Sequence, residues 1–509
     1  MKYNYSPRNL KEEGAGQQRL FEILPGALSW SVIIGMMVLS LVKPLIASVI
    51  MIAFLLYWVL RLIYVNIFLV LSYIKLAAEK NTDWMQRIDG IDKDNLAMPK
   101  SKDIYHLVII PVLKETKEII EPGVARIIKG SYPARRILVV VAVEESASDE
   151  VKKGAYRIQE EYKTEFMDLL VTAHPNNLRG EARVKGANTS FAAKHAKDYF
   201  TGRNIPFENI IVSCFDADTV PEKDYFSCLT YHFMTNPKRT KTSYQPVPVY
   251  YNNIWNVPAF ARIIDIGTSF FQLVEATDPR KLVTFSSHSM SFKALVDVDY
   301  WPVDMISDDS AIFWKAFIHY DGDYRTMPIY TTVSMDIASG RDIKETVINI
   351  YKQKRRWAWG VENFPVVVRA FIKSKSISLY KRTIYLYKLL DTFISWATWS
   401  FLLSFASWLP AFFAGREFST STVFYTAPRI RTTIFSLASV GIIICMLISI
   451  LMLPPRKGKR HPLKKIQHAL EWLFIPVVIL ALSAIPALDA QTRLALGKYM
   501  EFWHTEKYR

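Results

Sequence analysis

Long apolar runs lie near both ends of the chain, and the middle has none. Residues 27–74 are almost wholly apolar, with Lys43 and Pro44 interrupting the run. About 20 helical residues cross a bilayer core, so this run predicts two membrane helices that turn near Lys43 and Pro44. Further runs of the same kind follow at residues 384–414, 432–453 and 469–489. The pattern therefore predicts about five membrane helices, two before the middle region and three after it.

Between the membrane segments, short Val- and Ile-rich runs alternate with helix-like stretches. These runs are residues 105–113, 136–146, 166–174 and 208–218. Apolar runs without polar alternation are typical of strands covered on both faces, and strand-helix-strand order favours a mainly parallel, Rossmann-like sheet. The predicted fold class is α/β, with ligands bound in the loops at the carboxyl edge of the sheet.

The segment from 341 to 375 differs from both regions, because it is basic, aromatic and amphipathic. Such composition predicts helices that lie on a membrane surface. The predicted organisation is an N-terminal segment at 1–26, two membrane helices at 27–75, an α/β domain at 100–340, interfacial helices at 341–383, about three membrane helices at 384–489 and a tail at 490–509.

Charge then predicts the orientation. The 509-residue chain has a formal net charge of +16, much of it in loops beside the apolar runs, such as residues 454–468. Lys and Arg in short loops are retained in the cytoplasm, so this loop and, two membrane helices earlier, the α/β domain are predicted to be cytoplasmic. Topology thus explains the charge without a nucleic-acid partner. We expect an integral protein of the plasma or inner membrane.

The three cysteines, Cys214, Cys228 and Cys445, lack the spacing of a metal site. We interpret them as small apolar residues in a reducing compartment.

An Asp-x-Asp motif, Asp216 and Asp218, stands at the end of the fourth strand-like run. Two carboxylates after a strand can share a hard divalent ion, and Mg²⁺ or Mn²⁺ commonly combines such ligands with substrate phosphate oxygens. The alternative is a turn or helix cap with solvated aspartates.

A second acidic pair, Asp308 and Asp309, precedes an amphipathic stretch. Both residues could simply be charges favoured at a helix N-terminus. The alternative is catalytic: one carboxylate acts as a general base for a sugar hydroxyl, and crowding within the pair raises one pKa.

The stretch YKQKRRWAWG, residues 351–360, places cations beside two indoles. Arg356 offers permanently charged, planar donors to phosphate oxygens, Trp357 offers a face to a pyranose ring, and Gln353 can hydrogen-bond to substrate. A basic amphipathic anchor is the alternative for the whole stretch. The remaining cations, Lys352, Lys354 and Arg355, are expected to face lipid headgroups.

In their order, Asp-x-Asp, the acidic pair and Gln-x-x-Arg-Trp resemble the family 2 inverting glycosyltransferases. The similarity is greatest to the processive membrane synthases of cellulose, chitin and hyaluronan, and it covers about residues 100–365. It implies a GT-A fold, a nucleotide-diphosphate sugar donor that we expect to be UDP-linked, and a Mg²⁺ or Mn²⁺ cofactor. The implied acceptor is a glycan or a lipid-linked sugar. Accessory subunits cannot be inferred.

The resemblance also implies a role for each matching residue. Asp309 is the implied base, with Asp308 in place of the family's Glu, and Asp218 is the implied metal ligand. The implied substrate and nucleotide contacts are Glu144, Glu145, Lys185, Asp216, Gln353, Arg356 and Trp357. Glu144 and Glu145 stand where the family has an Asp that contacts uracil.

The function that the resemblance implies is processive synthesis of a β-linked polysaccharide. Two alternatives stay open: transfer of a single sugar to a lipid carrier, and an inactive membrane scaffold. The Glu144-Glu145 departure favours the scaffold, whereas the three downstream motifs favour an enzyme.

Overall fold

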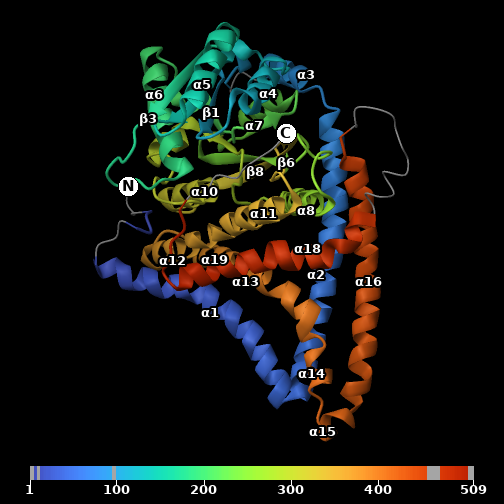
Figure 1. The fold of residues 1–509 in the computed structure, drawn as a ribbon. Coiled ribbons are helices and arrows are strands. Elements are labelled where there is room, and N and C mark those ends of the chain that lie inside the picture. Colours follow the sequence, from blue (N-terminus) through green and yellow to red (C-terminus); the bar gives the residue numbers. More distant parts are fainter. Residues whose placement is uncertain (1–4, 9–11, 95–98, 455–469, 502–509) are drawn as a thin grey trace.

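The computed structural model describes residues 5–8, 12–94, 99–454 and 470–501. Figure 1 shows an α/β domain at one end, long helices extending away from it, and a layer of crosswise helices between the two. The prediction of an α/β domain inserted between N- and C-terminal apolar helices is confirmed.

The α/β domain is built on one mixed sheet with the strand order β3-β2-β1-β4-β7-β6-β8-β5. The strands are β1 (Tyr105–Val112), β2 (Ile137–Glu144), β3 (Asp168–His174), β4 (Ile210–Cys214), β5 (Val220–Pro221), β6 (Thr242–Val249), β7 (Ser289–Ser291) and β8 (Arg325–Ser334). The first four pair in parallel, as do β6 and β8, while β5 and β7 run antiparallel to their neighbours. All four predicted strands are present.

Helices cover both faces of the sheet, which explains why its central strands are apolar throughout. They are α3 (Trp84–Asp94), α4 (Lys117–Ile128), α5 (Asp149–Tyr162), α6 (Lys185–Gly202), α7 (Tyr225–Thr235), α8 (Ala259–Glu275), α9 (Phe292–Asp297) and α10 (Asp308–His319). In β1, Val108 and Ile110 face the core beneath α4, α5 and α7, whereas Leu107 and Ile109 face the core beneath α6, α9 and α10. Because both faces of the sheet are covered, a ligand can reach the central strands only at their ends.

Two helices follow the sheet, α11 (Ile343–Ala358) and α12 (Asn363–Lys373). The side chain of Asp342 caps α11 by accepting a hydrogen bond from the Glu345 amide at 2.7 Å. Within the segment predicted to form interfacial helices, α12 is buried from Asn363 to Phe371 because it packs against α1, α10 and α13.

Five runs of the described residues are long and apolar enough to cross a membrane, as predicted, and they make the chain an integral membrane protein. The helices concerned are α1 (Glu12–Val42), α2 (Pro44–Lys80), α13 (Leu379–Phe401) with α14 (Leu409–Phe412), α16 (Thr422–Met452), and α18 (Ile475–Ile479) with α19 (Ile485–Ala495); the short α15 (Arg416–Ser419) precedes α16. The chain breaks at Lys43 as expected, because Pro44 starts a new helix.

Two helices extend beyond the apolar runs into the predicted terminal segments. The segment 1–26 is helical from Glu12, because α1 continues towards the α/β domain, and the tail at 490–509 begins with the last turns of α19. Gln491 in those turns is buried and accepts a hydrogen bond from Ser29 of α1 at 2.7 Å. The basic loop predicted at 454–468 lies, apart from Pro454, outside the described residues.

The fifth apolar run lies across the others. In Figure 1, α18 and α19 cross the direction of α2 and α16 and lie beside α11. At its start Trp472 stacks on Phe270 of α8, with ring centroids 5.6 Å apart, and near its end Asp489 accepts hydrogen bonds from Tyr351 and Arg355 of α11. Both ends therefore lie on the side of the α/β domain, where the chain's last described residues also lie.

Candidate active site

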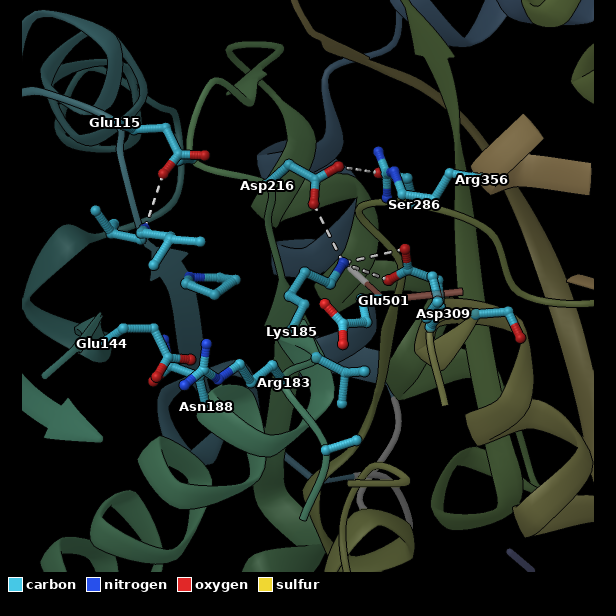
Figure 2. A pocket seen from close by; sticks show the side chains of 18 of the residues that line it. Glu115, Glu144, Arg183, Lys185, Asn188, Asp216, Ser286, Asp309, Arg356 and Glu501 are labelled. Atoms are coloured by element: carbon cyan, nitrogen blue, oxygen red, sulfur yellow. Dashed lines mark hydrogen bonds and ion pairs between the residues drawn. The ribbon is translucent and has the colours of Figure 1, made fainter. Parts of the chain in front are cut away.

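One cavity of about 600 Å³ opens at the carboxyl edge of β1, β2, β3 and β4. Figure 2 shows its acidic and basic side chains converging from several elements. The predicted site residues that line it are Glu144, Lys185, Asp216, Asp218, Asp309, Gln353, Arg356 and Trp357. Glu145 and Asp308 do not line it. The structure thus brings together residues up to about 200 positions apart in the chain.

Lys185, the first residue of α6, stands at the centre of the acidic groups (Figure 2). Its Nζ lies 2.9 and 3.0 Å from the two carboxylate oxygens of Asp309 and 3.2 Å from Oδ1 of Asp216. Burial alone would lower the pKa of this lysine, but Asp216, Asp308 and Asp309 raise it well above its usual value. Lys185 is therefore a fixed positive charge inside the cavity.

Two close backbone approaches hold the motifs in place. A Cβ atom at Gly186 would lie 2.3 Å from the Pro302 carbonyl oxygen, so only glycine lets the start of α6 approach the loop before Asp308. A Cβ atom at Gly123 would lie 2.4 Å from the Thr219 carbonyl oxygen, which lets α4 pack against the Asp-x-Asp loop. Neither contact has a signal in the sequence beyond the glycine itself.

The two adjacent aspartates at the start of α10 have different surroundings. The side chain of Asp308 is 3% exposed, and its carboxylate lies 3.7 Å from Lys185. Burial raises the pKa of Asp308 to about 8, against the opposing effect of Lys185. The side chain of Asp309 is 24% exposed and lines the cavity. The crowded pair therefore keeps one buried, protonated carboxyl and presents the other to the cavity.

Asp308→Asn is expected to lose less than about tenfold in activity and to change how stability depends on pH. The folded chain holds the Asp308 pKa near 8, whereas the unfolded chain releases this proton near pH 4. The folded state thus binds more protons between these values, so Asp308 makes the chain less stable as pH rises from about 4 to about 8. Asparagine does not titrate. The Tm of the variant relative to wild type should therefore rise across this range, and a difference independent of pH would contradict the assignment.

The Asp-x-Asp carboxylates are held in separate ways. Ser286 donates a hydrogen bond to Oδ2 of Asp216 at 2.6 Å, on the side opposite Lys185. Asp218 is 1% exposed, and its Oδ2 accepts a hydrogen bond from the Asp336 amide at 2.7 Å. Both side chains therefore have fixed positions at the cavity wall.

The end of α11 supplies the opposite wall through Gln353, Arg356 and Trp357. The Oε1 atom of Gln353 is buried and has no hydrogen-bond partner among the described residues. The ring of Trp357 lies 6.1 Å from the rings of both Tyr250 and Phe285, centroid to centroid. An aromatic wall with a polar group beside it suits a sugar ring.

Lys354 and Arg355 do not face lipid headgroups, contrary to the expectation for these cations. Lys354 is buried, and its Nζ lies 2.6 Å from Asp265 of α8 and 3.8 Å from the centroid of the Trp357 ring. Arg355 pairs with Asp489 of α19 at 2.9 Å. Both carboxylates come from helices whose packing the sequence did not reveal. Lys354, held by Asp265, therefore packs against the Trp357 ring and limits the positions that this ring can take.

Lys354→Met is expected to destabilise the chain by about 3–5 kcal/mol, because it removes one partner of a buried ion pair. Unfolding in detergent, followed by intrinsic fluorescence, measures the effect. The double variant Lys354→Met with Asp265→Leu should recover most of the loss, and the exposed Lys344→Met is the matched control. A single variant as stable as the control would contradict a supporting role for this ion pair.

The far end of the cavity contains a carboxylate-imidazole-carboxylate group. His174 lies 2.9 Å from Glu144 through Nδ1 and 2.9 Å from Glu181 through Nε2, and all three side chains line the cavity. Burial raises the pKa of Glu144, although His174 opposes the shift. Glu145 lies outside the cavity, where its carboxylate accepts a hydrogen bond from the Asn176 amide at 2.8 Å.

Comparison with known families decides the classification. A model of glycosyl transferase family group 2 matches residues 211–482, more than half of the chain. The chain belongs to this family. The match begins in β4, so it includes both acidic motifs and the Arg-Trp segment described above.

Several curated members of glycosyl transferase family group 2 are similar to the chain. The poly-beta-1,6-N-acetyl-D-glucosamine synthase of Staphylococcus epidermidis is 26% identical over 271 residues, which are 52% of this chain and 56% of that protein. The synthase of the same name from Staphylococcus aureus strain COL is 27% identical over the same shares. The chain thus spans about half the length of the curated relatives it matches.

Solved structures are similar more distantly. The mannosyltransferase PcManGT from Pyrobaculum calidifontis, in complex with GDP-Man and Mn²⁺, is 15% identical and covers 74% of this chain and 98% of its own, with a TM-score of 0.40. Staphylococcus aureus TarS 1–349 in complex with UDP-GlcNAc is 13% identical and covers 66% and 90%, with a TM-score of 0.36. Scores this low support no conclusion about ligands.

A divalent cation, as expected for this glycosyl transferase family, suits the residues present. The cavity wall offers carboxylate oxygens from Asp216 and Asp218, which are hard ligands that favour Mg²⁺ or Mn²⁺ over softer metals. One or two protein carboxylates with substrate phosphate oxygens make a typical Mg²⁺ site. The donor set therefore fits the predicted cofactor.

Sequence reasoning missed several residues that line the cavity, among them His174, Glu181 and Glu501. His174 ends β3 and pairs in register with Glu144 at the end of β2, so aligning the ends of the predicted strands could have found it. Glu501 follows α19 and reaches the cavity because the fifth apolar run lies crosswise (Figures 1 and 2). Its position depends on long-range packing and has no local signal.

Proposed function

We propose that this chain is an inverting glycosyltransferase that extends a β-linked polysaccharide from a UDP-linked sugar, with N-acetylglucosamine as the first candidate donor sugar. The observation that carries the proposal is the convergence of Asp309, Lys185, Asp218 and Trp357 on one cavity. The names of the similar synthases support the sugar and the polymeric product.

Asp309 is the proposed general base. It lines the cavity at the start of α10, while its neighbour Asp308 stays buried and protonated. The acceptor hydroxyl oxygen forms a bond to the anomeric carbon as the bond from that carbon to the diphosphate oxygen breaks. The hydroxyl proton moves to the Asp309 carboxylate, and attack from the face opposite the diphosphate inverts the configuration.

Lys185 and Arg356 are the proposed stabilisers of the departing diphosphate. Lys185 is fully charged and held by Asp216 and Asp309, so phosphate oxygens can replace part of this carboxylate coordination when the donor binds. Fixed positive charge where negative charge grows lowers the barrier of the transfer step. A divalent ion held by Asp218 and Asp216 would neutralise further charge on the diphosphate.

The group formed by Glu144, His174 and Glu181 is the proposed contact for the nucleobase. It lies at the ends of β2 and β3, and Figure 2 shows Glu144 on the side of the cavity opposite Arg356. His174 holds Glu144 through Nδ1, which fixes the orientation of that carboxylate. An oriented carboxylate can accept a hydrogen bond from the N–H group of a uracil ring.

Trp357, with Tyr250 and Phe285, is the proposed platform for the acceptor sugar. Trp357 stands on α11, which lies next to the crosswise α19 and above the membrane helices (Figure 1), whereas Tyr250 follows β6 and Phe285 precedes β7. The basic loops beside the apolar runs favour a cytoplasmic position for the cavity. The growing chain would then leave on the membrane side of the α/β domain.

A panel of radiolabelled nucleotide sugars tests the proposal. Membranes that contain the chain are incubated with each donor, and the released nucleotide and the size of the labelled product are measured. We expect release of UDP and a product that lengthens with time when the donor is UDP-N-acetylglucosamine. Products of one added sugar at high donor concentration would instead support transfer to a lipid carrier, and no turnover with any donor would support an inactive scaffold.

A further inference from the structure

Three metal-ligating side chains meet where α2 ends against the α/β domain. They are Glu79, in the last turn of α2, and Cys228 and His232 on α7. The ligand atoms, a carboxylate oxygen, a thiol sulfur and an imidazole nitrogen, all lie within 4.8 Å of one another. These residues do not line the cavity of the candidate active site. The cluster therefore needs an explanation of its own.

Helix geometry and long-range packing each contribute to this cluster. Cys228 and His232 are four positions apart, so they lie on one face of α7. Glu79 comes from a segment about 150 residues earlier and is brought there by the end of α2. Sequence spacing alone does not reveal such a site, which is why Cys228 was interpreted as a small apolar residue.

Two polar atoms of the cluster make no hydrogen bond within the described residues, and they pair with each other only at the outer limit of an ion pair, when His232 is protonated. Cys228 is fully buried, and the Oε2 atom of Glu79 and the Nε2 atom of His232 are buried without a hydrogen-bond partner among the described residues. These two atoms are 3.9 Å apart. A buried polar atom without a partner costs about 1–3 kcal/mol, so two such atoms facing one sulfur point to a ligand between them.

The donor set indicates which ligand this is. We propose that Glu79, Cys228 and His232 bind one Zn²⁺ ion, with the fourth position open to water. Zinc accepts sulfur, nitrogen and oxygen ligands in a tetrahedral site, whereas Mg²⁺ and Ca²⁺ avoid thiolate. One thiolate and one carboxylate also neutralise the charge of Zn²⁺, which suits a site where Cys228 is buried and Glu79 and His232 are only partly exposed.

The geometry requires only a small contraction. Bond lengths of about 2.0–2.3 Å place tetrahedral ligands about 3.5 Å apart. The ligand atoms, which now lie within 4.8 Å of one another, therefore need to approach by at most about 1.3 Å. The Trp84 ring packs 5.4 Å from the His232 ring, centroid to centroid, and Arg87 lies over Trp84. These side chains cover the imidazole and limit the number of positions it can take.

The proposed ion would fasten the domain end of α2 to α7. Helix α7 follows the loop that carries Asp216 and Asp218, so the link would connect a membrane helix to the segment behind the candidate active site. The role is structural and does not depend on the proposed function. A failure of this site would leave the glycosyltransferase proposal unchanged.

Cobalt spectroscopy of the full-length chain tests the site. The chain is purified in detergent, stripped with a chelator and titrated with Co²⁺. A thiolate ligand gives an intense sulfur-to-cobalt charge-transfer band, which the oxygen ligands of Asp216 and Asp218 cannot give. We expect this band to saturate at about one Co²⁺ per chain and to disappear when Zn²⁺ is added.

Cys228→Ala should abolish the band, whereas Cys445→Ala, on α16, should keep it. Absence of the band in the wild-type chain, or its survival in Cys228→Ala, would overturn the proposal.

Two further variants keep the test valid if Cys228→Ala folds poorly. Glu79→Gln and His232→Gln preserve the thiol and the approximate side-chain volume. Competition with a chromophoric chelator should show Zn²⁺ affinity reduced by about tenfold or more in each variant. Added Zn²⁺ should raise the Tm of the wild-type chain and not that of His232→Gln. Wild-type Zn²⁺ affinity in both variants would show that these side chains are not ligands.

Discussion

Asp309→Asn is expected to lower kcat by about 10³-fold while donor affinity stays within a few-fold of wild type. Asparagine keeps the shape of the side chain but cannot take the acceptor proton. Lys185 would keep its ion pair with Asp216 at 3.2 Å, so the donor side of the cavity should keep its positive charge. Steady-state release of UDP gives kcat, and equilibrium binding of UDP gives the affinity.

Asp94→Asn, an exposed substitution on α3, is the matched control and should have wild-type kinetics. Asp308→Asn is a second control, because it removes the neighbouring carboxyl group. Burial raises the pKa of Asp308 to about 8, so this carboxyl is poorly suited to accept a proton at neutral pH. We expect Asp308→Asn to lose less than about tenfold, far less than Asp309→Asn. If Asp309→Asn kept more than a tenth of wild-type turnover, another group would have to be the base.

Lys185→Gln is expected to reduce kcat/KM by about 10²–10³-fold, because the departing diphosphate loses a fixed positive charge. The same change leaves Asp216, Asp308 and Asp309 together without their shared cation. Donor binding should therefore weaken as well as turnover. Initial rates over a range of donor concentrations measure both effects.

Lys194→Gln, on the exposed face of the same helix, is the control for changes in α6 itself. Circular dichroism and Tm establish that Lys185→Gln is folded before its kinetics are interpreted. Lys185→Arg keeps the charge and should recover part of the loss, although a planar guanidinium fits the three carboxylates differently. Wild-type donor KM in Lys185→Gln would contradict contact between this lysine and the diphosphate.

Most of the fold could be predicted because hydrophobic periodicity decides it. Strands β1, β2 and β4 could be predicted because burial on both faces leaves no polar alternation. The edge strand β3, which is only partly buried, lies within a predicted apolar run as well. The break at Lys43 could be predicted because proline is favoured in the first turn of a helix and disfavours a helical conformation in the residue before it. The crosswise position of residues 472–495 could not be predicted. Composition shows only that a helix is long and apolar enough to cross a membrane, whereas its direction depends on how it packs against other helices.

Some residues of the candidate site could likewise be predicted from the sequence, and others could not. Asp218, Asp309 and Trp357 stand in short motifs that can be recognised in the sequence, and they line one cavity. His174 and Glu501 reach that cavity through strand register and the path of the C-terminal segment, which involve residues far apart in the chain. Local patterns identify groups that act as motifs, and they miss single residues brought in by tertiary packing.

The pairing of Lys354 with Asp265 shows a related limit. The sequence presents Lys354 among several cations next to a membrane, where headgroup contact is the ordinary expectation. The structure buries it against α8, 3.8 Å from the Trp357 ring. Charge density in a sequence indicates an interface, but it does not distinguish the cations that face lipid from those that face the protein.

The central claim is that this one cavity transfers sugars from a nucleotide donor with inversion. Its most direct test is the structure of the product made by the purified chain in lipid nanodiscs from UDP-N-acetylglucosamine, whose sugar is α-linked. Mass spectrometry and the anomeric proton couplings in NMR would define length and configuration. The account predicts a polymer of N-acetylhexosamine with β-linkages that Asp309→Asn does not make. An α-linked product, or equal synthesis by Asp309→Asn, would contradict it.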